Sequence, residues 1–223
     1  VYAIKELPEG LAEHEYDMLM KLEERRMPSV YATGHARMRH AGGEVRAALV
    51  TRFLDASLPY RTLFQNPGLA RYRERLLDAM AGLLVRLHLA GFYWGDCSLS
   101  NTLFRRDAGE LRAYLVDAET SEMHDELSNG QREQDLLIME ENVEGELADL
   151  AALAELPHEM RRDDTGITIR RRYEALWGEI SRELVLAPDE GWRIQERVRA
   201  LNALGFSVGE IELVHTGEGN RLR

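Results

Sequence analysis

The chain has 223 residues, with 44% apolar and 30% charged side chains, which is typical of an ordinary soluble globular protein. This length allows one sizeable core, or two small lobes with a cleft between them. The net charge of −11 argues against a nucleic-acid partner or an anionic membrane surface, because both bind basic patches.

The cellular compartment is indicated by what the sequence lacks. Cys97 is the single cysteine, so no intrachain disulfide can form, which suits a reducing cytoplasm. No run of about 18 apolar residues is present to span a membrane, and no signal peptide is recognisable. Because the chain begins at Val1 inside an expected strand, we expect a fragment of a longer, cytoplasmic protein.

The N-terminal quarter predicts strands around one helix. Residues 1–6 read V-Y-A-I-K-E, an extended segment that a proline and a glycine end. Apolar residues at helical spacing predict a helix over 11–26. A connector follows, with strand-forming residues at 30–31. A turn at 41–44 then leads into a mostly apolar central strand over 45–54.

The middle of the chain is predicted as one long helix followed by short strands. Residues 55–67 contain two prolines and are expected to be irregular. The stretch 69–89 follows the i, i+3, i+4 spacing of an amphipathic helix, and Gly91 is placed to end it. Two short apolar strands are predicted at 102–104 and 113–116.

The C-terminal half is predicted to be mainly helical. Apolar spacing predicts a helix over 130–155, followed by a loop over 161–168. Helices over 169–186 and 188–204 come next, the second opened by a Pro-Asp-Glu sequence. An alternating segment at 208–214 predicts a closing strand, and the polar residues after it predict a frayed tail.

One stretch, residues 88–119, carries the candidate chemistry. Asp96 and Asn101 stand in a D-x-x-x-x-N spacing after L-H-x-x-G, and the strand 113–116 delivers Asp117. A turn between the two segments can bring two carboxylates and one carboxamide together. Phosphoryl transfer needs such a set: a carboxylate to orient or deprotonate the acceptor hydroxyl, and oxygen ligands for Mg²⁺ on the nucleotide phosphates.

This ordered set resembles the protein-kinase-like superfamily, and most nearly the lipopolysaccharide-core sugar kinases, the RIO-type kinases, and the choline and aminoglycoside kinases. In those relatives the loop often reads His-Gly-Asp and the metal segment Ile-Asp-x-Glu. Here the corresponding sequences are W-G-D at 94–96 and V-D-A-E at 116–119. The resemblance covers about residues 2–119, and it implies ATP and Mg²⁺ as cofactors.

The resemblance implies roles for the polar residues of this stretch. Asp96 is the expected catalytic carboxylate, which accepts or orients the acceptor hydroxyl proton. Asn101 and Asp117 are the expected Mg²⁺ ligands, with Glu119 as a further metal ligand. Trp94 stands where relatives often carry His, and its indole can replace a lost hydrogen-bond donor.

Further roles follow for the N-terminal residues. The sequence Y-A-I-K resembles the Val-Ala-Ile-Lys strand of kinases, so Ala3 would cover adenine and Lys5 would reach the phosphates. Glu15 is the expected partner of Lys5, with Glu13 as the reserve candidate. By position alone, the segment 51–54 would be the hinge that offers backbone groups to adenine. Its expected cofactor-binding residues are Thr51, Phe53 and Leu54.

Structural explanations remain open for several of these residues. Lys5 could be a solvated lysine on a surface strand, and Glu15 an exposed helix carboxylate. Asp96 and Asn101 could merely cap a loop. His88 is expected to pack and hydrogen-bond to backbone groups rather than to act in catalysis, and Cys97 to fill a semi-buried space rather than to react as a thiol.

Charged segments outside the stretch have alternatives as well. The acidic region 122–164 is most simply a solvated helix face, although it could meet a basic protein partner. Within it, Asp125 and Asp135 could support the surrounding lobe. The run of three arginines at 170–172 could bind a phosphate, but a salt-bridged helix end is the favoured interpretation.

We therefore predict an α+β, protein-kinase-like bilobal fold. Residues 1–54 would be the remnant of a truncated N-lobe, 55–165 a C-lobe with the catalytic and metal-binding loops, and 166–223 a helical C-terminal extension. The Gly-rich phosphate lid expected upstream of the Lys5 strand does not occur in this sequence.

The predicted function is ATP- and Mg²⁺-dependent phosphoryl transfer to a hydroxyl of a small molecule, a sugar or a lipid headgroup. A protein acceptor is disfavoured because no Ala-Pro-Glu activation segment follows Asp117. The alternative is a pseudokinase that binds nucleotide or a partner without turnover. A third possibility is an unrelated α+β binding protein, in which Asp96, Asn101 and Asp117 do not converge.

Overall fold

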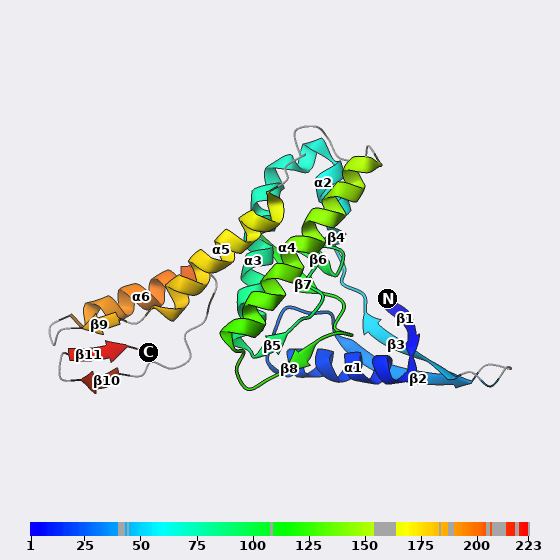
Figure 1. Cartoon of the computed structure of the whole chain (residues 1–223), viewed down its shortest axis with the longest axis horizontal. Coiled ribbons are helices and arrows are strands. Elements are labelled where there is room, and N and C mark those ends of the chain that lie inside the picture. Colours follow the sequence, from blue (N-terminus) through cyan, green and yellow to red (C-terminus); the bar gives the residue numbers. More distant parts are fainter. Residues whose placement is uncertain are drawn as a thin grey trace. The chain divides into compact units, whose positions relative to one another are not determined.

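The computed structural model divides the chain into two compact units, Val1–Glu174 and Ala175–Arg223 (Figure 1). Neither unit is described in full. The described residues are 1–39, 43, 45–107, 109–153, 164–182, 184–186, 190–203, 206, 213–216 and 219–222.

The first unit begins with a three-stranded antiparallel sheet. Its strands β1 (Tyr2–Pro8), β2 (Ala32–Arg39) and β3 (Val45–Arg52) lie in the order β1-β3-β2. The helix α1 (Glu9–Glu24) packs against β2 and β3, as Figure 1 shows. Central β3 carries the apolar run that the sequence predicts, and its middle residues are buried. The strands and the helix predicted here are confirmed, with shifted bounds.

Two details of this sheet differ from the prediction. Strand β2 runs from Ala32 to Arg39, so the residues recognised as strand-forming, 30–31, lie just before it. Its own residues were missed because most of them are exposed and lack an apolar alternation. Strand β3 ends at Arg52 rather than at residue 54. The predicted turn at 41–44 lies outside the described residues, apart from Gly43.

The larger part of the first unit contains the helix α3 (Arg73–Leu89), whose apolar face is fully buried. An antiparallel sheet in the order β4-β6-β7 packs on it through β7. Its strands are β4 (Ser57–Pro59), β6 (Thr102–Asp107) and β7 (Glu110–Leu115). A short pair joins β5 (Phe92–Tyr93) to β8 (Glu122–Met123). The β6–β7 hairpin confirms the two predicted strands and brings the two ends of the candidate stretch together.

The segment expected to be irregular, 55–67, instead contains β4, the helix α2 (Tyr60–Gln65) and the start of a 3₁₀ helix, η1 (Pro67–Tyr72). Tyr60, Leu63 and Phe64 are buried at the i, i+3, i+4 positions of α2. The helix is too short for periodicity to reveal it, and its prolines lie at its borders, where they are tolerated.

The helix α4 (Asn129–Ala152) is where the sequence places it. A capping box opens it: the Ser128 hydroxyl accepts from the Gln131 backbone N–H, and the Gln131 side chain accepts from the Ser128 backbone N–H. One face is buried along the whole helix. That face also includes Asp135, which is 0% exposed. The predicted end at residue 155 lies outside the described residues.

The helix α5 (Thr165–Ser181) starts inside the predicted loop 161–168 and ends before residue 186. Its first turn is buried: Arg73 donates to the Thr165 hydroxyl over 3.1 Å, and a Cβ on Gly166 would lie 2.9 Å from the Cα of Glu140. Close packing on α4 therefore extends the helix beyond what its own sequence favours. Residues 161–163 lie outside the described part.

The second unit, taken by itself, contains the end of α5, the helix α6 (Trp192–Ala203) and a three-stranded antiparallel sheet in the order β10-β11-β9. Its strands are β9 (Leu184–Leu186), β10 (Leu213–Thr216) and β11 (Gly219–Leu222). The prediction of a frayed tail after residue 214 was wrong, since this segment contains β11 and the second half of β10. The predicted helix was wrong at residues 184–186, which form β9, because pairing with β11 holds this segment extended. Most of the strand predicted at 208–214 lies outside the described residues.

Two glycine substitutions provide a test of this fold. Gly91 ends α3 at φ +74°, and a Cβ there would clash with the carbonyl oxygen of His124. We expect Gly91→Ala to lower the free energy of unfolding by about 2 kcal/mol or more, because L-residues are strained in this conformation. Gly82 lies within α3 and has open space around its Cα.

Gly82→Ala is the matched control, and we expect it to raise the free energy of unfolding by about 0.5–1 kcal/mol through helix propensity. Thermal unfolding of both variants by circular dichroism measures the effects. Equal shifts of Tm in the same direction would show that the α3 boundary is placed wrongly.

Candidate active site

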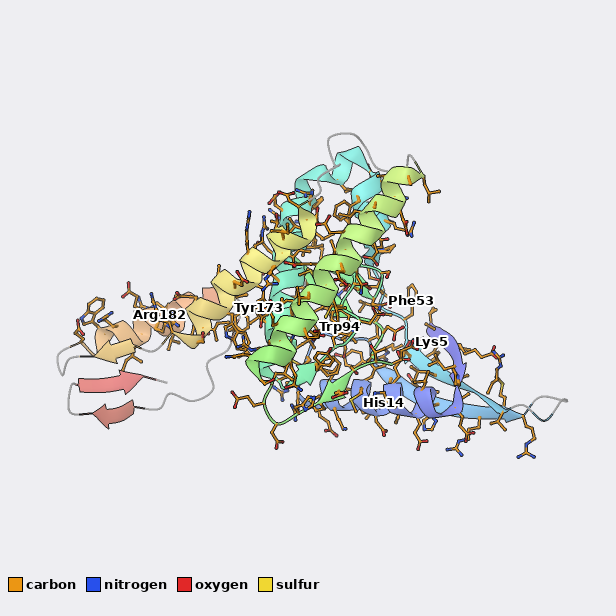
Figure 2. The ribbon with its side chains drawn as sticks, in the orientation of Figure 1. Lys5, His14, Phe53, Trp94, Tyr173 and Arg182 are labelled. Atoms are coloured by element: carbon orange, nitrogen blue, oxygen red, sulfur yellow. The ribbon has the colours of Figure 1, made fainter. Side chains whose placement is uncertain are left out.

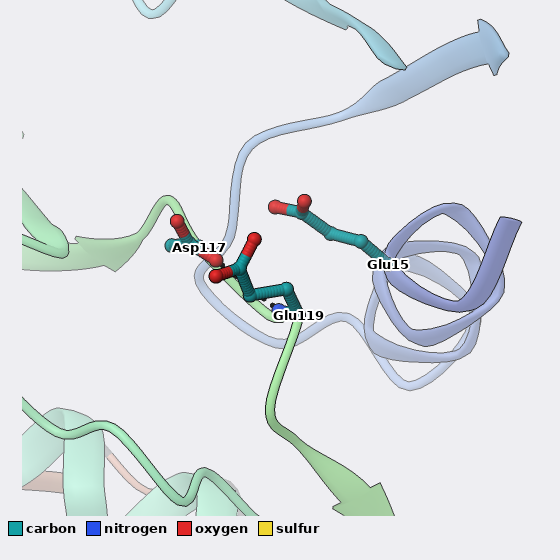
Figure 3. Close-up of side chains that lie close together, drawn as sticks. All are labelled: Glu15, Asp117 and Glu119. Carbon is teal, nitrogen blue, oxygen red and sulfur yellow. Dashed lines mark hydrogen bonds between the residues drawn. The ribbon is translucent and has the colours of Figure 1, made fainter. Parts of the chain in front are cut away.

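An ammonium group lies among three carboxylates at the edge of the N-terminal sheet. Lys5 Nζ is 3.1 Å from Glu15 Oε2, 2.5 Å from Asp117 Oδ2 and 3.1 Å from Glu119 Oε2. The three carboxylates lie within 4.8 Å of one another (Figure 3). They come from α1 and from the segment between β7 and β8, so residues more than 100 positions apart meet here.

The local structure explains this meeting. Strand alternation places Ala3, Lys5 and Leu7 on one face of β1, and Leu7 is buried there. Glu15 lies on the inner face of α1 and is 1% exposed, so it is not the exposed carboxylate that the structural alternative required. Its second oxygen accepts from the Ala118 backbone N–H over 3.3 Å. The reserve candidate Glu13 is exposed and pairs with Arg37 instead.

Burial and charge oppose each other in this cluster. Burial alone would lower the pKa of Lys5, but the hydrogen bond to Asp117 and the charges of Glu15 and Asp117 outweigh it and raise that pKa. Burial and the nearby Asp117 charge raise the pKa of Glu15, although Lys5 opposes them. Lys5 therefore keeps its positive charge within a cluster that has an excess of negative charge.

Asp96 lies in the loop that follows β5, and both of its carboxylate oxygens are hydrogen-bonded. Asn101 Nδ2 donates to Asp96 Oδ2 over 2.8 Å and to the Asp96 carbonyl over 3.2 Å. Asn142 Nδ2, from α4, donates to Asp96 Oδ1 over 2.9 Å and to the Cys97 carbonyl over 3.1 Å. The D-x-x-x-x-N spacing thus forms a closed turn with its two ends in contact.

Hydrogen bonds connect this loop to the segment that carries Asp117. The Val116 backbone N–H donates to the Asn101 carbonyl over 3.0 Å. The Trp94 indole Nε1 donates to the Asp117 carbonyl over 2.9 Å. The loop that carries Asp96 and Asn101 is therefore hydrogen-bonded to the backbone at and beside Asp117. The unrelated binding-protein hypothesis expected these three residues not to converge.

A buried polar network lies beneath the loop. Asp135, on α4, accepts from the backbone N–H groups of Trp94 and Gly95, each over 2.8 Å, and contacts His88 Nε2 at 3.2 Å. The other His88 nitrogen lies 2.8 Å from the Tyr173 hydroxyl. His88 packs as expected, but its partners are side chains rather than backbone groups. In Figure 2, Trp94 and Tyr173 lie among the helices, whereas Lys5 lies on the N-terminal sheet.

The sequence did not reveal two polar residues that hold the loop, Asn142 and Glu146. The carboxylate of Glu146 accepts from the backbone N–H groups of Leu99 and Ser100 over 2.9 and 2.8 Å. Asp135, Asn142 and Glu146 follow helical spacing on one face of α4. Polar residues interrupting an otherwise apolar stripe were the available signal.

The expected hinge residues lie beside the expected adenine cover. Thr51 pairs with Ala3 across β1 and β3. The Phe53 backbone N–H donates to the Val1 carbonyl over 3.1 Å. Phe53 is 49% exposed and Leu54 is buried. Ala3 and Thr51 are thus cross-strand neighbours, and Lys5 lies two residues further along β1 on the same face.

The remaining candidates have structural explanations. Cys97 is buried, and burial raises the pKa of its thiol well above the usual range, so it is a space-filling residue. Arg170 pairs with Glu133 and Glu174, and Arg172 with Asp78, so this run lies within a salt-bridged helix rather than at its start. Part of the acidity of 122–164 is therefore used within the chain, and a basic partner for the rest stays a prediction.

Comparison with known proteins agrees with this arrangement. The solved structure "WaaP in complex with acyl carrier protein" shares the fold, with a TM-score of 0.55 and 19% identity over 91% of this chain and 80% of that chain. The fold is thus a mixed α/β, kinase-like fold with antiparallel sheets.

The sequence profile of the "Lipopolysaccharide kinase (Kdo/WaaP) family" matches residues 1–156, so the chain belongs to this family. A second profile, "Domain of unknown function (DUF4032)", matches residues 175–223, the same residues as the second compact unit. No curated protein matches the chain significantly in sequence. Among the described residues, no helix is long and apolar enough to cross a membrane.

The excess negative charge around Lys5 gives a direct test of the site. In Lys5→Met, three carboxylates remain close together without a cation. We expect the affinity for Mg²⁺ without nucleotide to rise by about tenfold or more, because the removed charge repelled the ion from a few ångströms away. The increase in Tm on adding MgCl₂ measures it.

The control is Lys21→Met, which removes the only other lysine of the chain from an exposed position on α1. Its response to MgCl₂ should equal that of the unmodified protein. An equal response in Lys5→Met would mean that the three carboxylates do not form a cation site.

Proposed function

We propose that this chain is an ATP- and Mg²⁺-dependent phosphotransferase that phosphorylates a hydroxyl of a small molecule, a sugar or a lipid headgroup. Membership of the lipopolysaccharide kinase family supports phosphoryl transfer. The single observation that carries the proposal is the ion cluster in which Lys5 contacts Glu15 and Asp117. Val116, the residue before Asp117, hydrogen-bonds to Asn101 and so connects the cluster to the Asp96–Asn101 turn. This arrangement gathers the charges that phosphoryl transfer requires.

The oxygen-rich donor set fits a magnesium ion. Asn101, Asp117 and Glu119 would supply oxygen ligands, which Mg²⁺ prefers. The contacts of the Lys5 ammonium with Asp117 and Glu119 indicate that these carboxylates attract a cation. Bound Mg²⁺ would neutralise charge on the β- and γ-phosphates. Lys5, oriented by Glu15, would bind phosphate oxygens and keep its proton throughout.

Asp96 would act on the acceptor. Its carboxylate would accept a hydrogen bond from the acceptor hydroxyl and orient the oxygen in line with the γ-phosphorus. As the new oxygen–phosphorus bond forms and the bond to ADP breaks, the hydroxyl proton would pass to Asp96. Ala3, Thr51, Phe53 and Leu54 would surround the adenine, consistent with the pairing of Ala3 and Thr51.

The segment between Asp117 and α4 supports a non-protein acceptor. This segment is short and passes directly through β8 to Ser128, so it offers little surface for holding a peptide. The family description favours a sugar hydroxyl of a lipid-linked glycan. The solved neighbour was captured with acyl carrier protein, which also makes a lipid-linked acceptor worth testing.

A pseudokinase is the second candidate function. The contact between Lys5 and Asp117, 2.5 Å long, neutralises a carboxylate that a metal would otherwise use. A module that binds nucleotide weakly, or binds only a partner, would be compatible with that contact. Asp96-dependent turnover of ATP would exclude this candidate.

The first prediction concerns nucleotide binding. We expect the protein to bind ATP in a Mg²⁺-dependent manner, and Asp117→Ala to weaken this binding by at least about tenfold, or ~1.4 kcal/mol. Isothermal titration calorimetry with and without MgCl₂ measures it. Asp125→Ala, which removes an exposed aspartate, is the control and should bind normally. Mg²⁺-independent binding, or equal affinity in Asp117→Ala, would contradict the assignment of the metal site.

The second prediction concerns turnover. Asp96→Asn should change the dissociation constant of Mg²⁺–ATP by no more than about threefold, yet lower turnover by ~10²-fold or more, as expected for a lost general base. Release of ADP, with water or an added sugar as acceptor, measures the rate. Asp125→Asn serves as the control. Unchanged turnover in Asp96→Asn would remove Asp96 from the reaction.

A further inference from the structure

The carboxylate of Asp96 is held from two directions. Asn101 donates to its Oδ2 from within the loop, and Asn142 donates to its Oδ1 from α4. An ionised carboxylate only accepts hydrogen bonds, so both carboxamides must point their nitrogen atoms toward it. The same Asn142 nitrogen also donates to the Cys97 carbonyl, so both of its N–H groups are used.

The position of Asn142 in α4 makes it a rigid support. Its neighbours on the buried face, Met139 and Val143, are both 0% exposed. Asp135, seven residues earlier, and Glu146, four residues later, bind backbone N–H groups on either side of Asp96. The helix thus holds the loop at three points, and Asn142 is the one of the three that contacts the Asp96 side chain.

We propose that Asn142 is a positioning residue for Asp96, a proposal that deepens the proposed function and rests on it. Asn101 is also a candidate metal ligand, so it alone would couple the orientation of Asp96 to the metal site. Asn142 fixes the second oxygen independently of the metal. With both oxygens held, the carboxylate plane is set, and the remaining lone pairs face the acceptor hydroxyl without reorganisation.

The proposal predicts a rate effect without a binding effect. Asn142→Leu should lower kcat for Mg²⁺-dependent ADP release from ATP by about 10–100-fold, because misplacing a reacting group by about 1 Å has this order of effect. The KM for ATP and the calorimetric dissociation constant of Mg²⁺–ATP should change by less than about twofold, because Asn142 is not among the residues proposed to bind the nucleotide or the metal. Equal losses in kcat and in affinity would overturn the proposal.

Two further variants separate the hydrogen bond from the shape. Asn142→Asp keeps the size but replaces both donors with acceptors beside a carboxylate, and it should lose at least as much kcat as Asn142→Leu. Asn142→Gln retains a donor on a longer arm and should recover part of the rate. Gln134→Leu removes a carboxamide from the exposed face of the same helix and should leave kcat unchanged.

A double substitution tests whether Asn142 acts through Asp96. If it does, adding Asn142→Leu to Asp96→Asn should lower the residual rate by no more than about twofold, because the group it positions is already lost. If the loss of rate in the double variant equals the product of the losses in the two single variants, Asn142 acts elsewhere and the proposal is overturned.

The contact itself can be observed without turnover, which separates this proposal from the proposed function. If the unmodified protein binds Mg²⁺–ATP but releases no ADP, the proposed function fails, and the side-chain amide resonances of Asn142 decide the inference. Assigned from the spectrum of Asn142→Asp, these ¹H–¹⁵N signals should shift in Asp96→Ala and stay in place in Asp125→Ala. If the Asn142 side-chain signals do not shift in Asp96→Ala, the contact is refuted.

Discussion

The requirement that buried backbone N–H groups find acceptors governs the loop around Asp96. Trp94 and Leu99 are both 0% exposed, yet they lie in irregular backbone that cannot pair within a helix or sheet. Asp135 and Glu146 accept these N–H groups from α4, and two charged acceptors replace the missing secondary structure. The conformation of the loop that carries Asp96 therefore depends on a helix that begins more than thirty residues later.

The N-terminal sheet is connected to this loop through one ion cluster. Glu15 binds the Lys5 ammonium with one oxygen and the Ala118 backbone N–H with the other. The buried carboxylate of Glu15, on α1, thus contacts both β1 and the segment that follows β7. One ammonium faces three carboxylates here, so the cluster keeps an excess of negative charge. A bound divalent cation would offset that charge, so the cluster fits a metal-assisted reaction such as phosphoryl transfer better than it fits a structural salt bridge.

Local patterns made part of this site predictable. Lys5 and Glu15 were identified from a short strand and a helix, and Asp96 and Asn101 from their spacing, because each pattern lies within a few residues of chain. Asn142 and Glu146 were not identified, because their partners lie more than forty residues away and helical spacing shows only which face they occupy. The fold followed the same rule: long periodic helices were predicted, whereas α2 and β11 are short and depend on tertiary packing.

Trp94 was one reason to consider the pseudokinase alternative, since relatives often carry His there. Its indole is buried and donates to the Asp117 carbonyl, while its backbone N–H donates to Asp135. The residue therefore connects the Asp96 loop, the Asp117 segment and α4, the connection expected of a bracing side chain. Unlike His, an indole cannot lose its donor by changing tautomer or charge. The substitution removes an ionisable group and keeps the link, so it is compatible with an active enzyme.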